Sequence, residues 1–230
     1  MNAAKDCTLQ EKLLRCAMAL ILAAGALLAS VAASPAYAAP STVDVSIGGK
    51  IPYGGFATTW MSADGNIAYC AEPSSPTPAA GSYSTSPVPS GDVTAAIWYS
   101  FGSPGFDASM FPGSWYDGGG WDDAKYAAAS HVLIAYAYSG SESAATHGTS
   151  AEFASWAKSE LIGGTFAKMK AGVGKVSAGF EAFCVRTGGG SQTLVSFSWS
   201  AGGVKFAKTD SEAGAEPQGD ASLDGASFSV

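Results

Sequence analysis

Residues 121–140, WDDAKYAAASHVLIAYAYSG, are the most helix-like stretch of the chain. Asp122 or Asp123 is suited to cap the start of a helix, and Gly140 is a typical helix stop. Between these ends, apolar residues recur at the spacing of helical turns. We therefore expect one long helix that carries His131 among apolar neighbours.

Strand-like runs lie on both sides of this helix. Short β-forming runs at Val43–Val45 and Ile67–Tyr69 precede it, bounded by Gly and Pro. After it, residues 180–188 and 191–202 alternate as two antiparallel strands joined by a turn. The period of two places three residues of the first of these strands on one face: Phe180, Ala182 and Cys184. The pattern predicts an α+β fold in which β elements frame a small helical part.

Two further helices and two loops complete the expected domain. Asp92 is suited to open a short apolar helix that ends near Gly102, and a third helix is expected from Ser150 to Leu161. Residues 72–92 contain five prolines and many serines, which predicts a surface loop. A second loop, rich in glycine and aromatic residues, precedes Trp121.

The N-terminus indicates export. Basic residues precede an uncharged apolar run, Cys16–Ala33, which reaches the small-residue site Ala36–Ala38. Residues 1–38 are therefore predicted to be a secretory signal peptide, with no other membrane segment. The net charge of -7 and the absence of Lys/Arg runs argue against nucleic acid as a partner.

Export makes the cysteines informative. Cys7 and Cys16 belong to the predicted signal peptide, so Cys70 and Cys184 remain. In an exported chain, such a pair first suggests a disulfide. It would close a long loop and stabilise the fold by roughly 4 to 5 kcal/mol on the chain-entropy model. Alternatively, Cys184 is simply a small core residue.

The chain resembles the thioester domain of Gram-positive surface adhesins. Tyr69 and Cys70 match the family's "YC" marker, and the predicted helix has Ser130 and His131 where the family's "TQ" marker is expected. Residues 95–106, AAIWYSFGSPGF, are similar to the intervening region of actinobacterial relatives. The resemblance covers about 43–198 and implies an adhesin module over 39–200.

The resemblance implies a specific chemistry at Cys70. In the family, a cysteine thiolate attacks a glutamine carboxamide, ammonia leaves, and the acyl group can pass to an amine such as a host lysine. His131 has no acyl group to give. Of the two glutamines after the signal peptide, Gln218 lies in the C-terminal tail, and Gln192 can approach Cys70 only if their strands are neighbours. We therefore expect a non-covalent or altered attachment site, with no enzymatic turnover and no cofactor.

Other functions remain as alternatives. A Cys70–His131 pair would also suit a secreted peptidase or transpeptidase, because an imidazole can activate a thiol. A structural pilus subunit with the Cys70–Cys184 disulfide is a further alternative. Cys70, Cys184, His131 and His147 have no zinc-site spacing, so no metal is expected. A group of aromatic residues could stack on carbohydrate or plug the core: Trp98, Tyr99, Phe101, Phe106, Phe111, Trp115, Tyr116 and Trp121.

The C-terminal tail resembles another module of the same surface proteins. Residues 204–210, VKFAKTD, and the acidic text that follows are similar to the start of a Cna-B or SpaA-type repeat, a prealbumin-like β-sandwich. The resemblance makes Lys208 the isopeptide-forming lysine of a repeat truncated over 203–230, and the chain a fragment. The expected protein is a secreted, cell-surface or cell-wall adhesin of a Gram-positive bacterium. Its expected partners are further repeats and a host surface or matrix protein or glycan.

Overall fold

A computed structural model describes residues 39–200 of the chain. The predicted signal peptide (1–38) and the predicted repeat with Lys208 lie outside the described residues. The strands are β1 (Thr42–Tyr53), β2 (Phe56–Ala63), β3 (Asn66–Cys70), β4 (Gly81–Pro87), β5 (Phe180–Arg186) and β6 (Leu194–Trp199). The helical segments are α2 (Gly91–Tyr99), η1 (Ala108–Met110), α3 (Asp123–Ser139), α4 (Glu142–Ala145), α5 (Ala151–Trp156), η2 (Ala157–Phe166), α6 (Ala167–Ala171) and η3 (Val173–Lys175).

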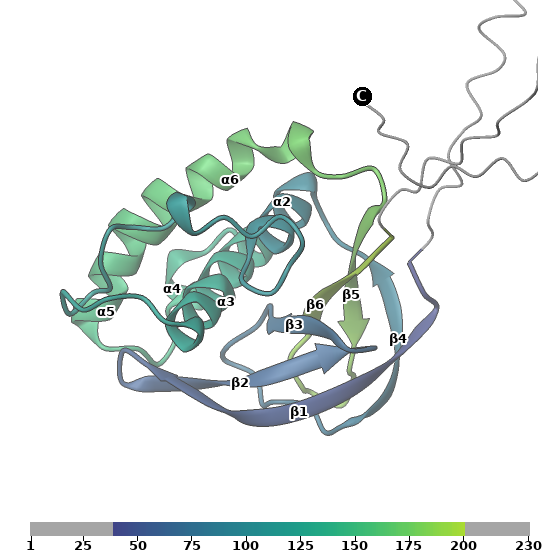
Figure 1. The fold of residues 1–230 in the computed structure, drawn as a ribbon. Coiled ribbons are helices and arrows are strands. Elements are labelled where there is room, and N and C mark those ends of the chain that lie inside the picture. Colours follow the sequence, from purple (N-terminus) through teal and green to yellow (C-terminus); the bar gives the residue numbers. More distant parts are fainter. Residues whose placement is uncertain (1–38, 201–230) are drawn as a thin grey trace, which may run out of the picture.

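The strands close into a barrel on which the helices pack. The order is β1-β2-β3-β6-β5-β4, with β4 returning to β1, and every pairing is antiparallel. Figure 1 shows the helices gathered on one side of the barrel, with α3 and α2 between it and the outer helix that ends in α6. The fold is α+β, as predicted, and the expected pairing of β5 with β6 is present.

The core has two parts, and β1 contributes to both. Val43 and Val45 belong to a smaller cluster made by strand residues, whereas Ile51 and Tyr53 belong to the larger cluster shared with the helices. A bulge between Ile47 and Lys50 adds one residue to β1 relative to β2. Because side chains alternate along a strand, one extra residue exchanges the two faces of β1.

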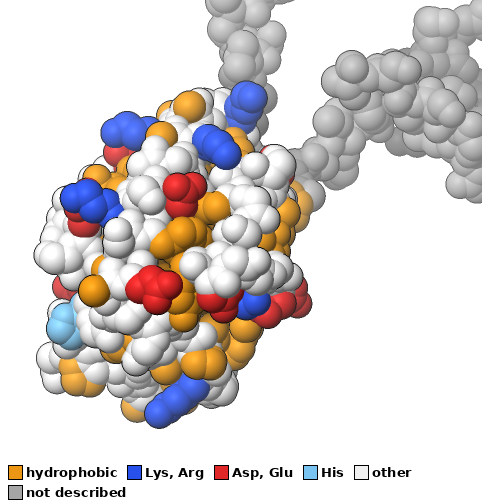
Figure 2. Space-filling view, turned by 90° about the vertical axis from the view of Figure 1, so that its left-hand side faces the viewer, with side chains coloured by type: hydrophobic (Ala, Val, Ile, Leu, Met, Phe, Trp, Pro, Cys, Tyr) orange, Lys and Arg blue, Asp and Glu red, His pale blue; other side chains and the backbone are white. Residues whose placement is uncertain are grey.

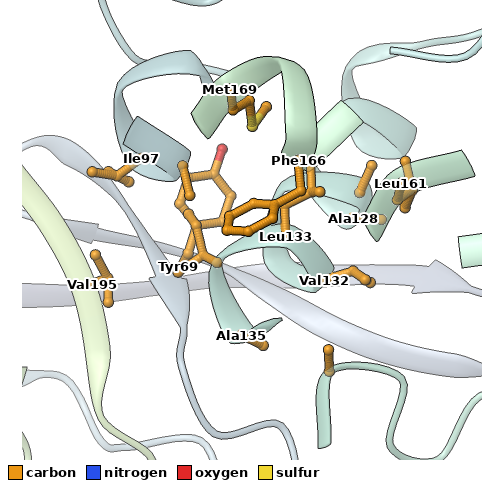
Figure 3. Packing of buried hydrophobic residues seen from close by; sticks show 14 of the residues in the cluster. Tyr69, Ile97, Ala128, Val132, Leu133, Ala135, Leu161, Phe166, Met169 and Val195 are labelled. Atoms are coloured by element: carbon orange, nitrogen blue, oxygen red, sulfur yellow. The ribbon is translucent and has the colours of Figure 1, made fainter. Parts of the chain in front are cut away.

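Helix α3 lies at the centre of the larger cluster. Its N-cap, Asp122, accepts a hydrogen bond from the Lys125 N–H, and Gly140 ends the helix in the left-handed conformation (φ 67°), as the sequence predicts. Residues from Ala127 to Ala135 are all buried, so the helix is covered on every side rather than on one stripe. Figure 3 shows Val132 and Leu133 of α3 packed near Tyr69 of β3 and Phe166 of the outer helix.

The prediction that residues 72–92 form a loop throughout is wrong, because β4 lies inside that range. Ser82 to Ser84 pair with β1, and Ser84 to Pro87 pair with β5. The prolines at 73, 76 and 78 precede the strand, and Pro87 and Pro89 occupy or follow its last position. The stretch 79–86 has no proline, so its backbone N–H groups are free to join the barrel.

The third predicted helix begins where expected and runs further. The Ser150 side chain caps α5 by accepting from the Phe153 N–H. Beyond Leu161 the chain continues as the π-helical segment η2 and then α6, through Gly163 and Gly164. The two glycines weaken the sequence pattern of a helix, whereas the burial of Phe166 and Met169 against the core favours its continuation.

Candidate functional site

The site lies where β2 and β3 separate. Their ladder runs only from Met61–Ala68 to Ala63–Asn66. Beyond it, Tyr69 and Cys70 pair with β6 on their other side. The edge of Cys70 that faces β2 therefore lacks a strand partner, and its backbone N–H needs another acceptor.

His131 of α3 supplies that acceptor. The Cys70 N–H donates to His131 Nδ1 over 3.0 Å. Because Nδ1 uses its lone pair in this bond, the neutral ring carries its proton on Nε2. Tyr69 holds the other side of the ring in an edge-on contact with a centroid distance of 4.8 Å. The imidazole thus fills the gap between the strands.

Ser130, the residue before His131, fixes the same helical turn to the loop after α2. Its Oγ accepts a hydrogen bond of 3.0 Å from the Phe101 N–H. The Tyr69 hydroxyl donates to the Phe101 carbonyl. The Tyr69–Cys70 and Ser130–His131 pairs that carried the family resemblance are therefore joined through Phe101.

Thr58 of β2 connects the sulfur to the ring. Its Oγ1 lies 3.4 Å from Cys70 Sγ and 3.3 Å from His131 Nε2. Thr58 and His131 are both buried, at 5% and 2% exposure. Thr58 could not be identified from the sequence, because a threonine in a strand-forming run gives no reactive signature.

Burial sets the protonation of the site. It lowers the pKa of His131 to about 3, against a smaller opposing effect of a hydrogen bond with the Thr59 backbone. Burial also raises the pKa of the Cys70 thiol to about 11, and hydrogen bonds from Thr58 and Gln192 partly oppose the rise. At neutral pH the site therefore holds a neutral imidazole and a neutral thiol.

Gln192 completes the site, because β6 is the neighbour of β3. The loop before β6 is held against the segment after Cys70 by three hydrogen bonds: Ala71 N to Thr193 O at 2.9 Å, Gln192 N to Pro76 O at 3.0 Å, and Thr193 N to Glu72 Oε2 at 2.8 Å. Gln192 is 2% exposed, and its Oε1 has no hydrogen-bond partner. Its side chain lies near enough to the sulfur to lower the pKa of the Cys70 thiol.

These four side chains enclose a small cavity, called here the thiol pocket, which is lined by Thr58, Cys70, His131 and Gln192 among others. Its volume is about 50 Å³. Tyr53 and Phe56, at the β1–β2 turn, form part of its wall and also border an open groove of about 500 Å³ beside Trp115, Tyr116 and Asp117. The groove gives a ligand a place to lie next to the thiol pocket.

The alternative of a Cys70–Cys184 disulfide is corrected by the structure, in which both cysteines are free. They lie on β3 and β5, which flank β6. Two strand spacings separate them by roughly 10 Å, which exceeds the Cα separation that a disulfide spans. The Cys184 side chain belongs to the helix-facing cluster with Phe180 and Ala182, whereas Cys70 belongs to the smaller cluster.

His147 and the loop aromatics, which the sequence offered for a metal site and a carbohydrate-binding face, do not line the thiol pocket. His147 lies beside Phe56, with a ring-centroid distance of 6.4 Å, and the described residues 39–200 contain no group of three or more His, Cys, Asp or Glu side chains placed to hold a metal. The loop aromatics mostly pack on one another, as Trp115 does on Trp121 and Phe153. Figure 2 shows acidic and basic side chains spread over one face, several of them side by side, among hydrophobic and neutral ones.

The chain belongs to the thioester-domain family, because the family model "Thioester domain" matches residues 42–164. Domains of this class occur on cell-surface adhesins. The match includes Cys70 and His131 and ends before Gln192. No curated protein and no solved structure matches the chain. Within residues 39–200, no helix has the length and apolar character needed to cross a membrane.

Proposed function

We propose that this domain forms an internal thioester between Cys70 and Gln192 and uses it to attach covalently to an amine-bearing ligand. The observation that carries the proposal is the buried Gln192 carboxamide, which shares the thiol pocket with Cys70 and leaves Oε1 unpartnered. A buried amide oxygen without a donor costs about 1 to 3 kcal/mol. A thioester carbonyl is a weaker hydrogen-bond acceptor than the carbonyl of a carboxamide. Conversion of the Gln192 side chain to a thioester would therefore relieve part of that cost.

The bond-forming step needs only these two side chains. The Cys70 sulfur attacks Gln192 Cδ and forms the S–C bond. The C–N bond of the carboxamide breaks, and the thiol proton leaves with the nitrogen as ammonia. No oxidant, metal or cofactor enters the balance. Proximity in a preformed pocket supplies the effective concentration of the two groups.

Gln192 is a better acyl donor than any other residue of the site. His131 has no acyl group, and its Nδ1 already accepts the Cys70 N–H. The same bond and a pKa near 3 argue against His131 as the base of a peptidase or transpeptidase. The pairing of Cys70 with Leu194 places Gln192 two residues from the cysteine's strand partner.

The pocket suits a stored electrophile. About 50 Å³ admits few water molecules, so hydrolysis is slowed until an amine arrives. A ligand amine that attacks Gln192 Cδ would form an amide and release the Cys70 thiolate. The reaction occurs once for each molecule, so the domain acts as a covalent adhesin and not as an enzyme.

The wider setting is also part of the proposal. The signal-like sequence of residues 1–38 and the repeat-like tail support a secreted protein displayed on the cell surface or wall of a Gram-positive bacterium. Further repeats of the same polypeptide and a host surface or matrix ligand would be its partners. A protein with accessible lysines fits the amine chemistry better than a glycan does.

Intact mass of the secreted protein tests the proposal. The wild type should be lighter than its sequence by one ammonia, and methylamine should then add its full mass. Cys70→Ala and Gln192→Ala should abolish both changes, whereas Cys184→Ala, a matched cysteine control, should retain both. A wild-type mass equal to the sequence mass, with no methylamine adduct, would overturn the proposal.

A further inference from the structure

Thr58 is the hydroxyl-bearing side chain that contacts the sulfur of the proposed thioester. Its Oγ1 lies 3.4 Å from Cys70 Sγ, within range for a hydrogen bond to sulfur. The side chain is 5% exposed, so water does not compete freely for this hydroxyl. Nothing in the sequence motifs or in the family match assigns it a role.

The ring nitrogens of His131 leave the sulfur as the acceptor for the Thr58 proton. Thr58 Oγ1 lies 3.4 Å from Nδ1 and 3.3 Å from Nε2. Nδ1 already accepts the Cys70 N–H, so Nε2 carries the ring proton, and neither nitrogen is free to accept from Thr58. Sγ of Cys70 is within hydrogen-bond range and can accept.

We propose that Thr58 is a catalytic residue of the thioester reaction, donating its hydroxyl proton as a hydrogen bond to the Cys70 sulfur when the C–S bond breaks. His131 is a positioning residue, because it acts through Thr58. This inference rests on the proposed thioester between Cys70 and Gln192.

The hydrogen bond accelerates the transfer because it strengthens during the reaction. In the thioester, the sulfur is a weak acceptor. As the ligand nitrogen bonds to Gln192 Cδ, the C–S electron pair moves to the sulfur. The developing thiolate is a strong hydrogen-bond acceptor. The amine's surplus proton then neutralises the thiolate. An interaction that is stronger in the transition state than in the ground state raises the rate.

Gln192 and His131 are less suited to act as this donor. Burial raises the pKa of the thiol, so the thiolate is a poor leaving group without a donor. The Gln192 carboxamide loses its N–H groups when ammonia leaves. The His131 ring is engaged by the Cys70 N–H at Nδ1 and by a hydrogen bond with the Thr59 backbone.

The test is the rate of methylamine addition to the secreted full chain, followed by intact mass. Thr58→Val preserves the shape of the side chain and removes the hydroxyl. It should slow the addition by roughly ten- to hundredfold, the value of a hydrogen bond to a charged group. Thr58→Ser restores the hydroxyl and should recover most of the rate. Thr94→Val, at a half-buried position of α2 that does not line the thiol pocket, should react as the wild type does.

Each outcome separates this inference from the thioester itself. A wild type that loses ammonia, with a Thr58→Val variant that reacts equally fast, overturns the role of Thr58 alone. A folded Thr58→Val variant that never loses ammonia supports the role if Thr58→Ser restores the loss, and overturns it if Thr58→Ser does not. A wild type that never loses ammonia overturns both proposals.

Discussion

The two buried cysteines of this domain have opposite surroundings. Cys70 ends a strand whose β2 neighbour has separated from it, and three polar side chains, from Thr58, His131 and Gln192, line the same pocket as its sulfur. Cys184 lies in the middle of β5, paired on both sides, with Val195 and Ser86 as its strand partners. Both are almost fully buried, at 5% and 0% exposure. Burial therefore does not distinguish the two thiols, whereas an incomplete ladder with polar neighbours does.

The largest expected effect is a difference in thiol count. If Cys70 is acylated, a maleimide applied in acidic denaturant should label the wild type once, at Cys184. Gln192→Glu keeps the side-chain size but cannot release ammonia, so this variant should be labelled twice. Cys184→Ala should abolish the wild-type label. Two labels on the wild type, with no mass deficit, would remove the distinction between the two cysteines.

A second prediction concerns the free Cys70 thiol in Gln192→Ala. Burial raises its pKa from 9.0 to about 11, so the protonated form persists where an ordinary thiol would ionise. Two pKa units reduce the thiolate fraction near neutral pH about a hundredfold. Alkylation by iodoacetamide should therefore be slow at pH 7 and rise steadily towards pH 11. A rate that levels off below pH 9 would show that the polar neighbours outweigh burial.

The sequence predicted the helix and the C-terminal strands because each carries a local signal. Asp122, Gly140 and the apolar spacing define α3, and alternation with a glycine turn defines β5 and β6. Neither the closure of the barrel nor β4 has such a signal. Both depend on pairings between residues far apart in the chain, as in Ser86 with Cys184.

The sequence predicted Cys70, His131 and Gln192 as candidate site residues, but it did not predict that they lie together. Cys70 and His131 were found through short motifs, and Gln192 because so few glutamines follow the predicted signal peptide. The proximity of Gln192 to Cys70 depends on β6 lying beside β3, which no local pattern encodes. The disulfide alternative failed for the same reason, since β6 separates the two cysteines.

A third prediction tests whether the imidazole substitutes for a missing strand partner. His131→Leu would leave the Cys70 N–H buried without an acceptor, which should lower the free energy of unfolding by about 1 to 3 kcal/mol. His131→Gln keeps an acceptor and should lose less. His147→Leu, at the exposed histidine, is the matched control and should be close to neutral. Urea denaturation measures all three, and equal stability of His131→Leu and His147→Leu would contradict the bridging role.

The smallest expected effect is the difference between two serine substitutions. Cys184→Ser places a hydroxyl in the apolar cluster of Phe180 and Ala182, where an unpaired polar group costs about 1 to 3 kcal/mol. Cys70→Ser places the same hydroxyl beside Thr58 Oγ1, which can pair with it. Its cost, measured against a Gln192→Ala background so that no thioester contributes, should stay below about 1 kcal/mol. Urea denaturation measures the free energy of unfolding of both variants. A larger loss for Cys70→Ser than for Cys184→Ser would mean that the thiol pocket is no more polar than the apolar cluster around Cys184.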